Sequence, residues 1–268
     1  MNNLNSSSNF NIFARFKNPE LTAREYVDLC KRLVQAIQAG MPDLFSEEIY
    51  AWGYNTKTSG YLQKDWSNFD EIAFRQINYT EIAYQNPDPK NKKLTWESRS
   101  HLGFSSSYSN TKSKKRRIEI SISAGDCQFQ GLNRRQLGVI NFLFAEDMQE
   151  IINRELFIQT LNILTQVVKI DYAKLSSYEF GQQAKMQRGD TDNRPWMMNV
   201  EVGWINYFAN PSLYDLLPSK VGKTYLDNHG VVYWLSEQRP QMHNDRYDEQ
   251  LISTALEIDS LIREHQLI

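Results

Sequence analysis

The sequence predicts an α+β fold, in which an antiparallel sheet packs against a long central helix and against amphipathic helices near both ends of the chain. Two patterns carry this prediction. Apolar and polar residues alternate over 117–124, as in a strand with one buried face. Apolar residues recur at helical spacing over 22–40, 147–169 and 245–264. Strands and helices thus occupy separate stretches, which is typical of α+β proteins.

The first 40 residues are predicted to contain a tail and a helix. The segment 1–18 begins rich in Asn and Ser and lacks the basic and apolar regions of a secretory signal, so we expect a flexible tail. Thr22 and Glu25 have the spacing of a capping box, which predicts a helix that begins there and ends at Gly40. The next segment, 41–84, shows no decisive pattern.

The middle of the chain is predicted to form the sheet. Isoleucines alternate with polar residues in the strand 117–124. Segments 96–107 and 137–144 are expected to pair with this strand as an antiparallel meander. From 147 to 169 the spacing becomes helical, and this helix should be the longest of the chain and should pack on the sheet.

The C-terminal part is predicted to mix strands, loops and one helix. In order we expect a short strand, a polar loop, a segment that opens as a strand, a further strand and an amphipathic helix, at 172–178, 181–194, 196–208, 231–235 and 245–264. Asn244 or Asp245 is expected to cap that helix. No linker is long enough to force a domain boundary, so 19–268 is predicted to be a single domain.

Charge, cysteine content and hydropathy indicate which partners and which cellular compartment to expect. The chain has 30 basic and 32 acidic residues, a net charge of -2, so no overall positive field attracts nucleic acid and no direct nucleic-acid partner is expected. Two cysteines are too few for a disulfide framework, which favours a reducing compartment and a cytoplasmic location. No run of about 18 apolar residues occurs, so no membrane span is expected.

Motifs for catalysis and metal binding are scarce. The four histidines lack zinc-binding spacing, and no nucleophile elbow or glycine-rich phosphate loop occurs, so we expect a non-enzyme without metal or cofactor. His243, Asp245 and Asp248 are the nearest approach to a metal site, but carboxylates there are typical of a helix start. The enzyme alternative is a hydrolase whose site His229, His243 and Asp245 form only in three dimensions.

One basic run precedes the isoleucine strand. It consists of Lys112, Lys114, Lys115, Arg116 and Arg117. No aromatic residue lies inside the run, and the net charge of the chain is not basic. The run is therefore interpreted as a solvated hairpin loop whose lysines also discourage pairing between sheet edges.

A different pattern marks the C-terminal third. The segment 203–208 (Gly-Trp-Ile-Asn-Tyr-Phe) places three aromatics beside a glycine, and we expect Trp204 to be a core residue. A Leu-Leu-Pro step at 216–218, an apolar strand at 230–235 and the closing helix follow. This order resembles the C-terminal region of the immunity protein 52 family over about residues 145–264. The residues that carry the resemblance are Gly203, Trp204, Tyr207, Phe208, Pro218 and Gly230. The sequence departs from the family in having Asn228-His229 where a glycine would precede Gly230.

The resemblance implies an immunity protein. Members of this family bind and neutralise a cognate secreted toxin, of the polymorphic or type VI secreted class and commonly a nuclease of restriction-endonuclease type, by occluding it. Carboxylates that imitate phosphates and aromatic residues that slow dissociation would suit that partner. The candidate partner-binding residues are Asp190, Asp192, Asp227, Glu237, Asp245 and Asp248. The sequence is also compatible with a homo-oligomer, and a secretion-apparatus or phage adaptor remains the non-enzyme alternative.

Overall fold

The computed structural model describes residues 9–17, 20–45, 48–80, 94–100, 103–125, 137–189, 202–226 and 230–265. The chain divides into two compact units. The larger unit comprises 14–148 and 159–170, and the smaller unit comprises 1–13, 149–158 and 171–268. Because both units belong to one chain and compactness does not test independent folding, the single domain predicted for 19–268 stays a prediction.

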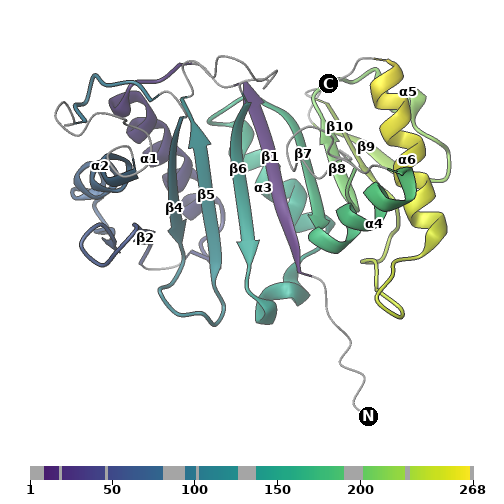
Figure 1. Cartoon of the computed structure of the whole chain (residues 1–268), viewed down its shortest axis with the longest axis horizontal. Coiled ribbons are helices and arrows are strands. Elements are labelled where there is room, and N and C mark those ends of the chain that lie inside the picture. Colours follow the sequence, from purple (N-terminus) through teal and green to yellow (C-terminus); the bar gives the residue numbers. More distant parts are fainter. Residues whose placement is uncertain are drawn as a thin grey trace, which may run out of the picture. The chain divides into compact units, whose positions relative to one another are not determined.

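The larger unit contains strands β2 to β6 and the last four residues of β1. Their bounds are β1 Phe10–Lys17, β2 Tyr50–Trp52, β3 Gly60–Tyr61, β4 Phe104–Ser109, β5 Ile118–Ala124 and β6 Leu137–Phe144. The strands lie in the order β3-β2-β4-β5-β6-β1 (Figure 1), and β2–β3, β2–β4, β4–β5 and β5–β6 pair antiparallel. Ile120 is paired with Tyr108 on β4 and Phe142 on β6, and all three are buried. The predicted meander is therefore confirmed, although β4 covers 104–109 rather than 96–107.

Strand β1 corrects the prediction that 1–18 is a flexible tail. Phe10, Ile12, Ala14 and Phe16 are buried and alternate with less buried neighbours, as in a strand with one buried face. Residues 10–17 therefore form a strand, whose first four residues belong to the smaller unit and whose last four belong to the larger unit.

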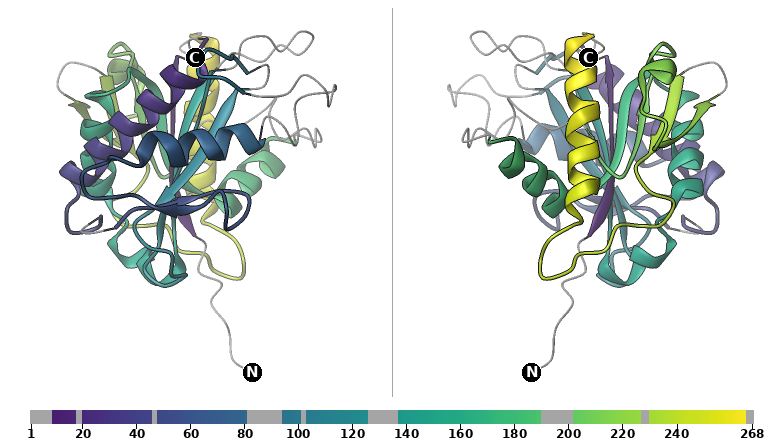
Figure 2. Two further views of the ribbon diagram at one scale, coloured as in Figure 1. Left: turned by 90° about the vertical axis from the view of Figure 1, so that its left-hand side faces the viewer. Right: turned by 90° about the vertical axis from the view of Figure 1, so that its right-hand side faces the viewer.

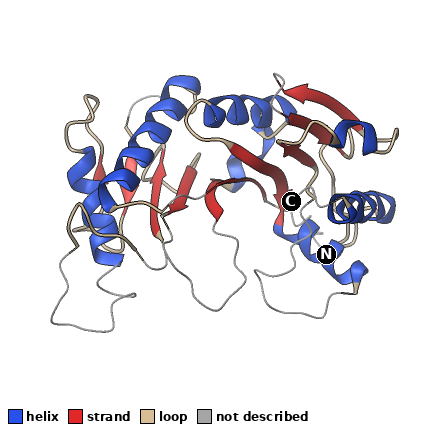
Figure 3. Cartoon of the chain, turned by 90° about the horizontal axis from the view of Figure 1, so that it is seen from above, coloured by secondary structure: helices blue, strands red, loops and turns tan. Residues whose placement is uncertain are grey.

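Helices α1 (Ala23–Gly40) and α2 (Phe69–Thr80) belong to the larger unit and pack against each other and against β4 (Figure 3). The capping box of α1 is confirmed. The Glu25 amide donates to Thr22 Oγ1 at 3.3 Å, and the Glu25 carboxylate accepts from the Thr22 amide at 2.8 Å. The helix also ends at Gly40, as predicted.

The segment 147–169 is not one long helix. A short 3₁₀ helix, η2 (Glu146–Ile151), is followed by α3 (Arg154–Thr165), and between them Asn153 Oδ1 accepts from the Leu156 amide at 2.8 Å. Asn153 thus supplies the cap of a new helix, because a side-chain acceptor satisfies an amide that has no partner in the first turn. Among the described residues α1 is longer, with 18 residues against 12 in α3.

The smaller unit contains strands β7 to β10 and helices α4 to α6. Their bounds are β7 Ile170–Ser177, α4 Tyr178–Arg188, β8 Ile205–Phe208, α5 Leu213–Leu216, β9 Gly222–Leu226, β10 Gly230–Trp234 and α6 Glu249–Glu264. These strands lie in the order β7-β8-β10-β9, and β7–β8, β8–β10 and β9–β10 pair antiparallel. Helix α6 lies beside α4 (Figure 2, right). Antiparallel strands with packed helices confirm the predicted α+β class.

Two glycines among the residues that resemble the immunity protein 52 family lie where backbones approach closely. A Cβ on Gly203 would stand 2.6 Å from the carbonyl oxygen of Leu175, and a Cβ on Gly230 would collide with that of Phe208. Larger residues would push these strands apart. Tyr207 and Phe208 are buried in the same ladder, so the motif is a packing feature of β8 and β10. Among the described residues, no helix combines the length and apolarity that a membrane span requires.

Candidate functional site

Three of the six predicted partner-binding carboxylates lie in the described residues. Glu237, Asp245 and Asp248 are exposed and stand in the segment 235–248, which we call the β10–α6 connection. Asp190, Asp192 and Asp227 lie outside the described residues. The described part of the predicted surface is therefore one continuous segment of the smaller unit.

The start of the β10–α6 connection is fixed by Trp204. The Leu235 amide donates to the Trp204 carbonyl at 2.9 Å, and the indole Nε1 donates to the Ser236 carbonyl at 2.8 Å. Trp204 is 3% exposed and meets Phe10 edge to face, with 5.7 Å between ring centroids. The indole is a core residue, as the sequence predicts, and it also positions the first residues of the connection.

The carboxylate of Glu237 is held in one position by its contacts, although the side chain is exposed. Its carboxylate accepts from Trp234 Nε1 at 2.7 Å and pairs with Arg154 at 3.2 Å, while 73% of its side chain is exposed. The Arg154 guanidinium lies 4.3 Å from the centroid of the Trp234 ring. An exposed ion pair contributes little stability, but the three contacts together restrict where the carboxylate points.

Asp245 stands at the tip of a tight turn. His243 and Arg246 exchange backbone hydrogen bonds of 2.8 and 3.1 Å, and the two residues between them, Asn244 and Asp245, have φ of 52° and 60°. Positive φ at both central residues is the signature of a type I′ turn, which Asn and Asp tolerate better than other side chains. Asp245 thus lies at an exposed position of a turn whose backbone is fixed by these hydrogen bonds.

Asp248 caps α6. Its carboxylate accepts from the amides of Gln250 at 2.9 Å and Leu251 at 3.0 Å. The prediction that Asn244 or Asp245 caps this helix is wrong, because both residues are used by the turn and the helix begins only at Glu249. Asp248 thus contributes negative charge to the surface while its oxygens satisfy the helix start.

The polar loop predicted over 181–194 is helix α4 as far as Arg188, and Gly189 ends it with a φ of 78°. The helix also holds the end of the β10–α6 connection. Gln183 Oε1 accepts from the Tyr247 amide at 2.8 Å, and Gln183 Nε2 donates to the Tyr247 carbonyl at 3.0 Å. The hydroxyl of the buried Tyr247 lies 2.8 Å from Ser177 Oγ.

A buried carboxylate joins α4 to α6. Asp259 is 2% exposed and pairs with Arg188 of α4 at 2.6 Å and with Arg263 of α6 at 2.8 Å. Gln187 also donates to Ser253 at 3.1 Å. Because a buried charge is tolerated only when it is paired, Asp259 makes the position of α4 depend on that of α6.

A cavity of about 470 Å³ lies beside the connection. The titratable residues that line it are Lys220, Arg239, His243 and Asp248. The Arg239 guanidinium donates to the Gln149 carbonyl at 2.5 Å, and burial lowers the pKa of Arg239.

The hydrolase alternative places His243 with Asp245 and His229, but Asp245 is not among the cavity-lining residues and His229 lies outside the described residues. In the part of the chain that the structure describes, no three His, Cys, Asp or Glu side chains are grouped to hold a metal ion.

The two units carry opposite net charges. The smaller unit contains 16 acidic and 10 basic residues, a net charge of -6 with histidine neutral. The larger unit contains 16 acidic and 20 basic residues, a net charge of +4. The net charge of -2 for the whole chain is therefore the sum of a basic unit and a strongly acidic unit. The acidic unit is the one that contains the β10–α6 connection.

Sequence reasoning missed the residues that hold this connection. Gln183, Tyr247 and Asp259 stand in helical or loop segments with no motif. The contacts Gln183–Tyr247 and Arg188–Asp259 join residues 64 and 71 positions apart. The charge division was readable from the sequence only with the unit boundaries in hand, since the smaller unit is assembled from three separate stretches.

No protein-family model matches the chain. No curated protein matches it either. Among solved structures, the chain is similar to Pseudomonas aeruginosa T6SS protein PA0821, with a TM-score of 0.49 and 14% sequence identity over 93% of this chain and 72% of that chain. At this level of similarity neither a partner nor an activity transfers to the chain.

Proposed function

We propose that this chain is an immunity protein that binds a secreted antibacterial toxin of the nuclease class and neutralises it by covering its active or substrate-binding surface. The observation that carries the proposal is the net charge of -6 on the smaller unit. A nuclease presents a positive surface to phosphates, and an acidic protein surface competes for it by charge complementarity. The resemblance to the immunity protein 52 family, over about residues 145–264, falls largely in the same unit.

The β10–α6 connection is the part of this unit best suited to contact the toxin. Trp204 fixes its beginning and Gln183 fixes Tyr247 near its end. Between these points Glu237 and Asp245 are exposed. A loop that is already ordered loses less entropy on binding, so the same contacts give a tighter complex. Acidic side chains on a rigid scaffold are thus the feature we assign to toxin binding.

Neutralisation of this kind requires no chemistry from the chain. We therefore propose that the protein is not an enzyme and acts in the cytoplasm of the producing cell, where the toxin would otherwise cleave nucleic acid. The positively charged surface of the toxin is the partner, and a typical stable complex buries about 1,600 Å² in total.

The test is to clone the gene directly upstream of the gene for this chain, to express it in cells, and to measure whether this chain protects them from its toxicity. The informative variant combines Glu237→Gln, Asp245→Asn and Asp248→Asn, because Asn still caps a helix and still tolerates positive φ. We expect the wild-type chain to protect and the triple variant to protect poorly while keeping its melting temperature within a few degrees. If the wild-type chain gives no protection, the immunity proposal is wrong.

A matched control separates this surface from total charge. Asp43→Asn, Glu48→Gln and Glu97→Gln remove the same three charges from exposed positions of the larger unit. This control variant should protect as the wild type does. Equal loss of protection in both triple variants would show that net charge, and not the β10–α6 connection, governs binding.

A further inference from the structure

A second charged surface lies on the larger unit, in the connection between β4 and β5. We define the basic hairpin as residues 110–117. Its cations are Lys112, Lys114, Lys115 and Arg116, which are exposed, and Arg117, which is partly buried. Within the described residues none of these five side chains forms an ion pair. The hairpin therefore concentrates positive charge that no ion pair among the described residues neutralises.

The fold brings aromatic residues to this hairpin that the sequence does not place inside it. Lys112 Nζ lies 5.5 Å from the ring centroid of Tyr50, and the Arg117 guanidinium lies 5.2 Å from that of Trp52. Both rings belong to β2, which pairs with β4. Cation–π contacts of this kind hold the two cations in place without cancelling their charge.

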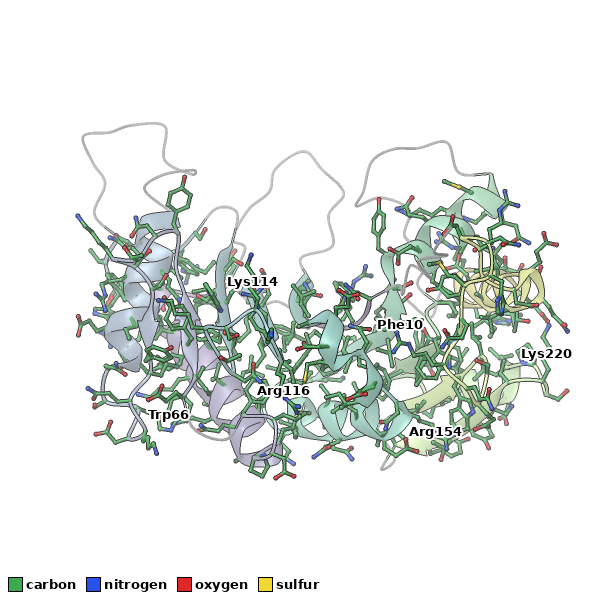
Figure 4. All side chains as sticks on the ribbon, turned by 90° about the horizontal axis from the view of Figure 1, so that it is seen from below. Phe10, Trp66, Lys114, Arg116, Arg154 and Lys220 are labelled. Carbon is green, nitrogen blue, oxygen red and sulfur yellow. The ribbon has the colours of Figure 1, made fainter. Side chains whose placement is uncertain are left out.

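The backbone of the hairpin is fixed by hydrogen bonds. Asn110 Nδ2 donates to the carbonyls of Arg116 and Leu44 at 3.0 Å each, and Asn110 Oδ1 accepts from the Ile118 amide at 2.8 Å. The Arg116 amide donates to the Asp147 carboxylate at 2.9 Å. Lys114 and Arg116 are labelled on the hairpin in Figure 4. The cations thus extend from an ordered loop.

Arg116 occupies a backbone conformation that glycine or asparagine adopts more easily. Its φ is 50°, in the left-handed region. The side chain is exposed and forms no ion pair among the described residues, so packing gives no reason for an arginine at this position. Neither backbone preference nor an ion pair among the described residues therefore explains the arginine, whereas a binding role for its charge would.

An exposed aromatic ring packs against Tyr50, on the strand beyond β2. Tyr61 of β3 is 46% exposed, and its ring centroid is 5.0 Å from that of Tyr50, the ring that Lys112 covers. A flat exposed ring beside unpaired cations is the combination that binds single-stranded nucleic acid, since bases stack on the ring and phosphates meet the cations.

We propose that the basic hairpin and Tyr61 bind single-stranded nucleic acid without sequence preference. An acidic protein segment would use the cations and leave the ring of Tyr61 uncovered, whereas a nucleic acid uses both. This differs from the sequence-based expectation of no nucleic-acid partner, which rested on the overall charge and on the absence of aromatics inside the run. The larger unit has a net charge of +4, and β2 and β3 supply the aromatics. The proposal concerns a different unit and a charge of the opposite sign from the proposed toxin-binding surface.

The test is fluorescence anisotropy of the full chain with a labelled oligothymidine of about 12 nucleotides, over a series of salt concentrations. At about physiological salt we expect a Kd of roughly 10⁻⁶ to 10⁻⁴ M, the range of non-specific binding, and tighter binding at lower salt. The double variant Lys114→Glu, Lys115→Glu should bind at least tenfold more weakly. Its log–log salt slope should be smaller by about 1.4, because each lost phosphate contact removes about 0.7 on a single strand. Tyr61→Leu should weaken binding roughly fivefold or more with the salt slope unchanged.

The matched control is Arg32→Glu with Lys169→Glu, the same charge change at two exposed positions of the same unit that form no ion pair among the described residues. It should bind much as the wild type does, and circular dichroism should show all variants folded. Three results would overturn the proposal. They are no binding by the wild type at low salt, equal weakening by the control, and binding of a labelled polyglutamate peptide as tight as that of the oligonucleotide with Tyr61→Leu neutral. The last result would assign the surface to an acidic protein.

Discussion

Gln183 on α4 binds both backbone groups of Tyr247, through bonds of 2.8 Å to the amide and 3.0 Å to the carbonyl. Replacing it with leucine would leave the buried backbone of Tyr247 without these partners. We expect Gln183→Leu to lower the free energy of unfolding by about 1–3 kcal/mol in urea denaturation. Gln182→Leu is the control, since Gln182 neighbours Gln183 on α4 and is only partly buried. Equal effects of the two variants would mean that the bonds to Tyr247 are not what stabilises this region.

We expect Trp204 to contribute to the stability of the fold rather than directly to partner binding. It is 3% exposed, and truncating a buried aromatic side chain costs about 3–5 kcal/mol. Trp204→Ala should therefore lower the melting temperature strongly, and Trp204→Phe should do so less, because it keeps the ring contact with Phe10 but loses the bond to the Ser236 carbonyl. An unchanged melting temperature in Trp204→Ala, together with lost partner binding, would place the residue in the interface instead.

Cys30 should be inert in the folded protein and should make stability fall at high pH. Burial raises the pKa of its thiol to about 12, against about 8.5 in an unfolded chain. Because the folded pKa is the higher one, this contribution to stability is complete below about pH 8.5 and is lost as the pH rises toward 12. In a Cys127→Ser background, iodoacetamide at pH 8 should modify Cys30 only as fast as the protein unfolds. Rapid modification without unfolding would contradict the burial of this thiol.

His243 tests whether the chain is an enzyme. Its backbone closes the turn before α6, and its side chain is exposed at the rim of the 470 Å³ cavity. We expect no hydrolase turnover from the wild-type protein on esters, phosphodiesters, peptides or glycosides, and no change in protection of cells by His243→Ala. Turnover that His243→Ala abolishes would revive the hydrolase alternative.

Elements with strong local patterns were predictable from the sequence. Helix α1 has a capping box and a glycine stop, and β5 has strict alternation of isoleucines with polar residues, so local geometry decides both. Strand β1 also alternates, in Phe-Asn-Ile-Phe-Ala-Arg-Phe, but the apolar Phe13 on its other face blurs the pattern and an Asn/Ser-rich stretch precedes it. Its assignment as a tail failed because composition was given more weight than period.

The arrangement of the candidate sites was harder to predict, because it depends on contacts between distant residues. Asp245 looks like a helix cap in sequence, yet positive φ at two successive residues commits it to a turn and leaves Asp248 as the cap. The basic run lacks aromatics in sequence, yet β2 places Tyr50 and Trp52 against it. In both places the tertiary fold, rather than local propensity, decides which groups meet.

The kinetics of toxin binding should reveal the role of charge at the β10–α6 connection. Exposed charges act mainly on association, because they attract the partner before contact and are screened over about 10 Å at 0.1 M salt. Removing the charges of Glu237, Asp245 and Asp248 should therefore lower the association rate several-fold at low salt. The difference from the wild type should shrink as salt rises.

Dissociation of the same complex should respond less, since short-range apolar and hydrogen-bond contacts determine the dissociation rate. The measurement is surface plasmon resonance of the triple variant (Glu237→Gln, Asp245→Asn and Asp248→Asn) and of the larger-unit control, each against the catalytically inactivated toxin at several salt concentrations. If neither the association rate nor the dissociation rate of the triple variant differs from that of the wild type at low salt, the acidic connection is not the toxin-binding surface, even where the wild-type chain protects cells. If instead only its dissociation rate changes, the three side chains are contact residues, and long-range attraction must come from other carboxylates of the smaller unit.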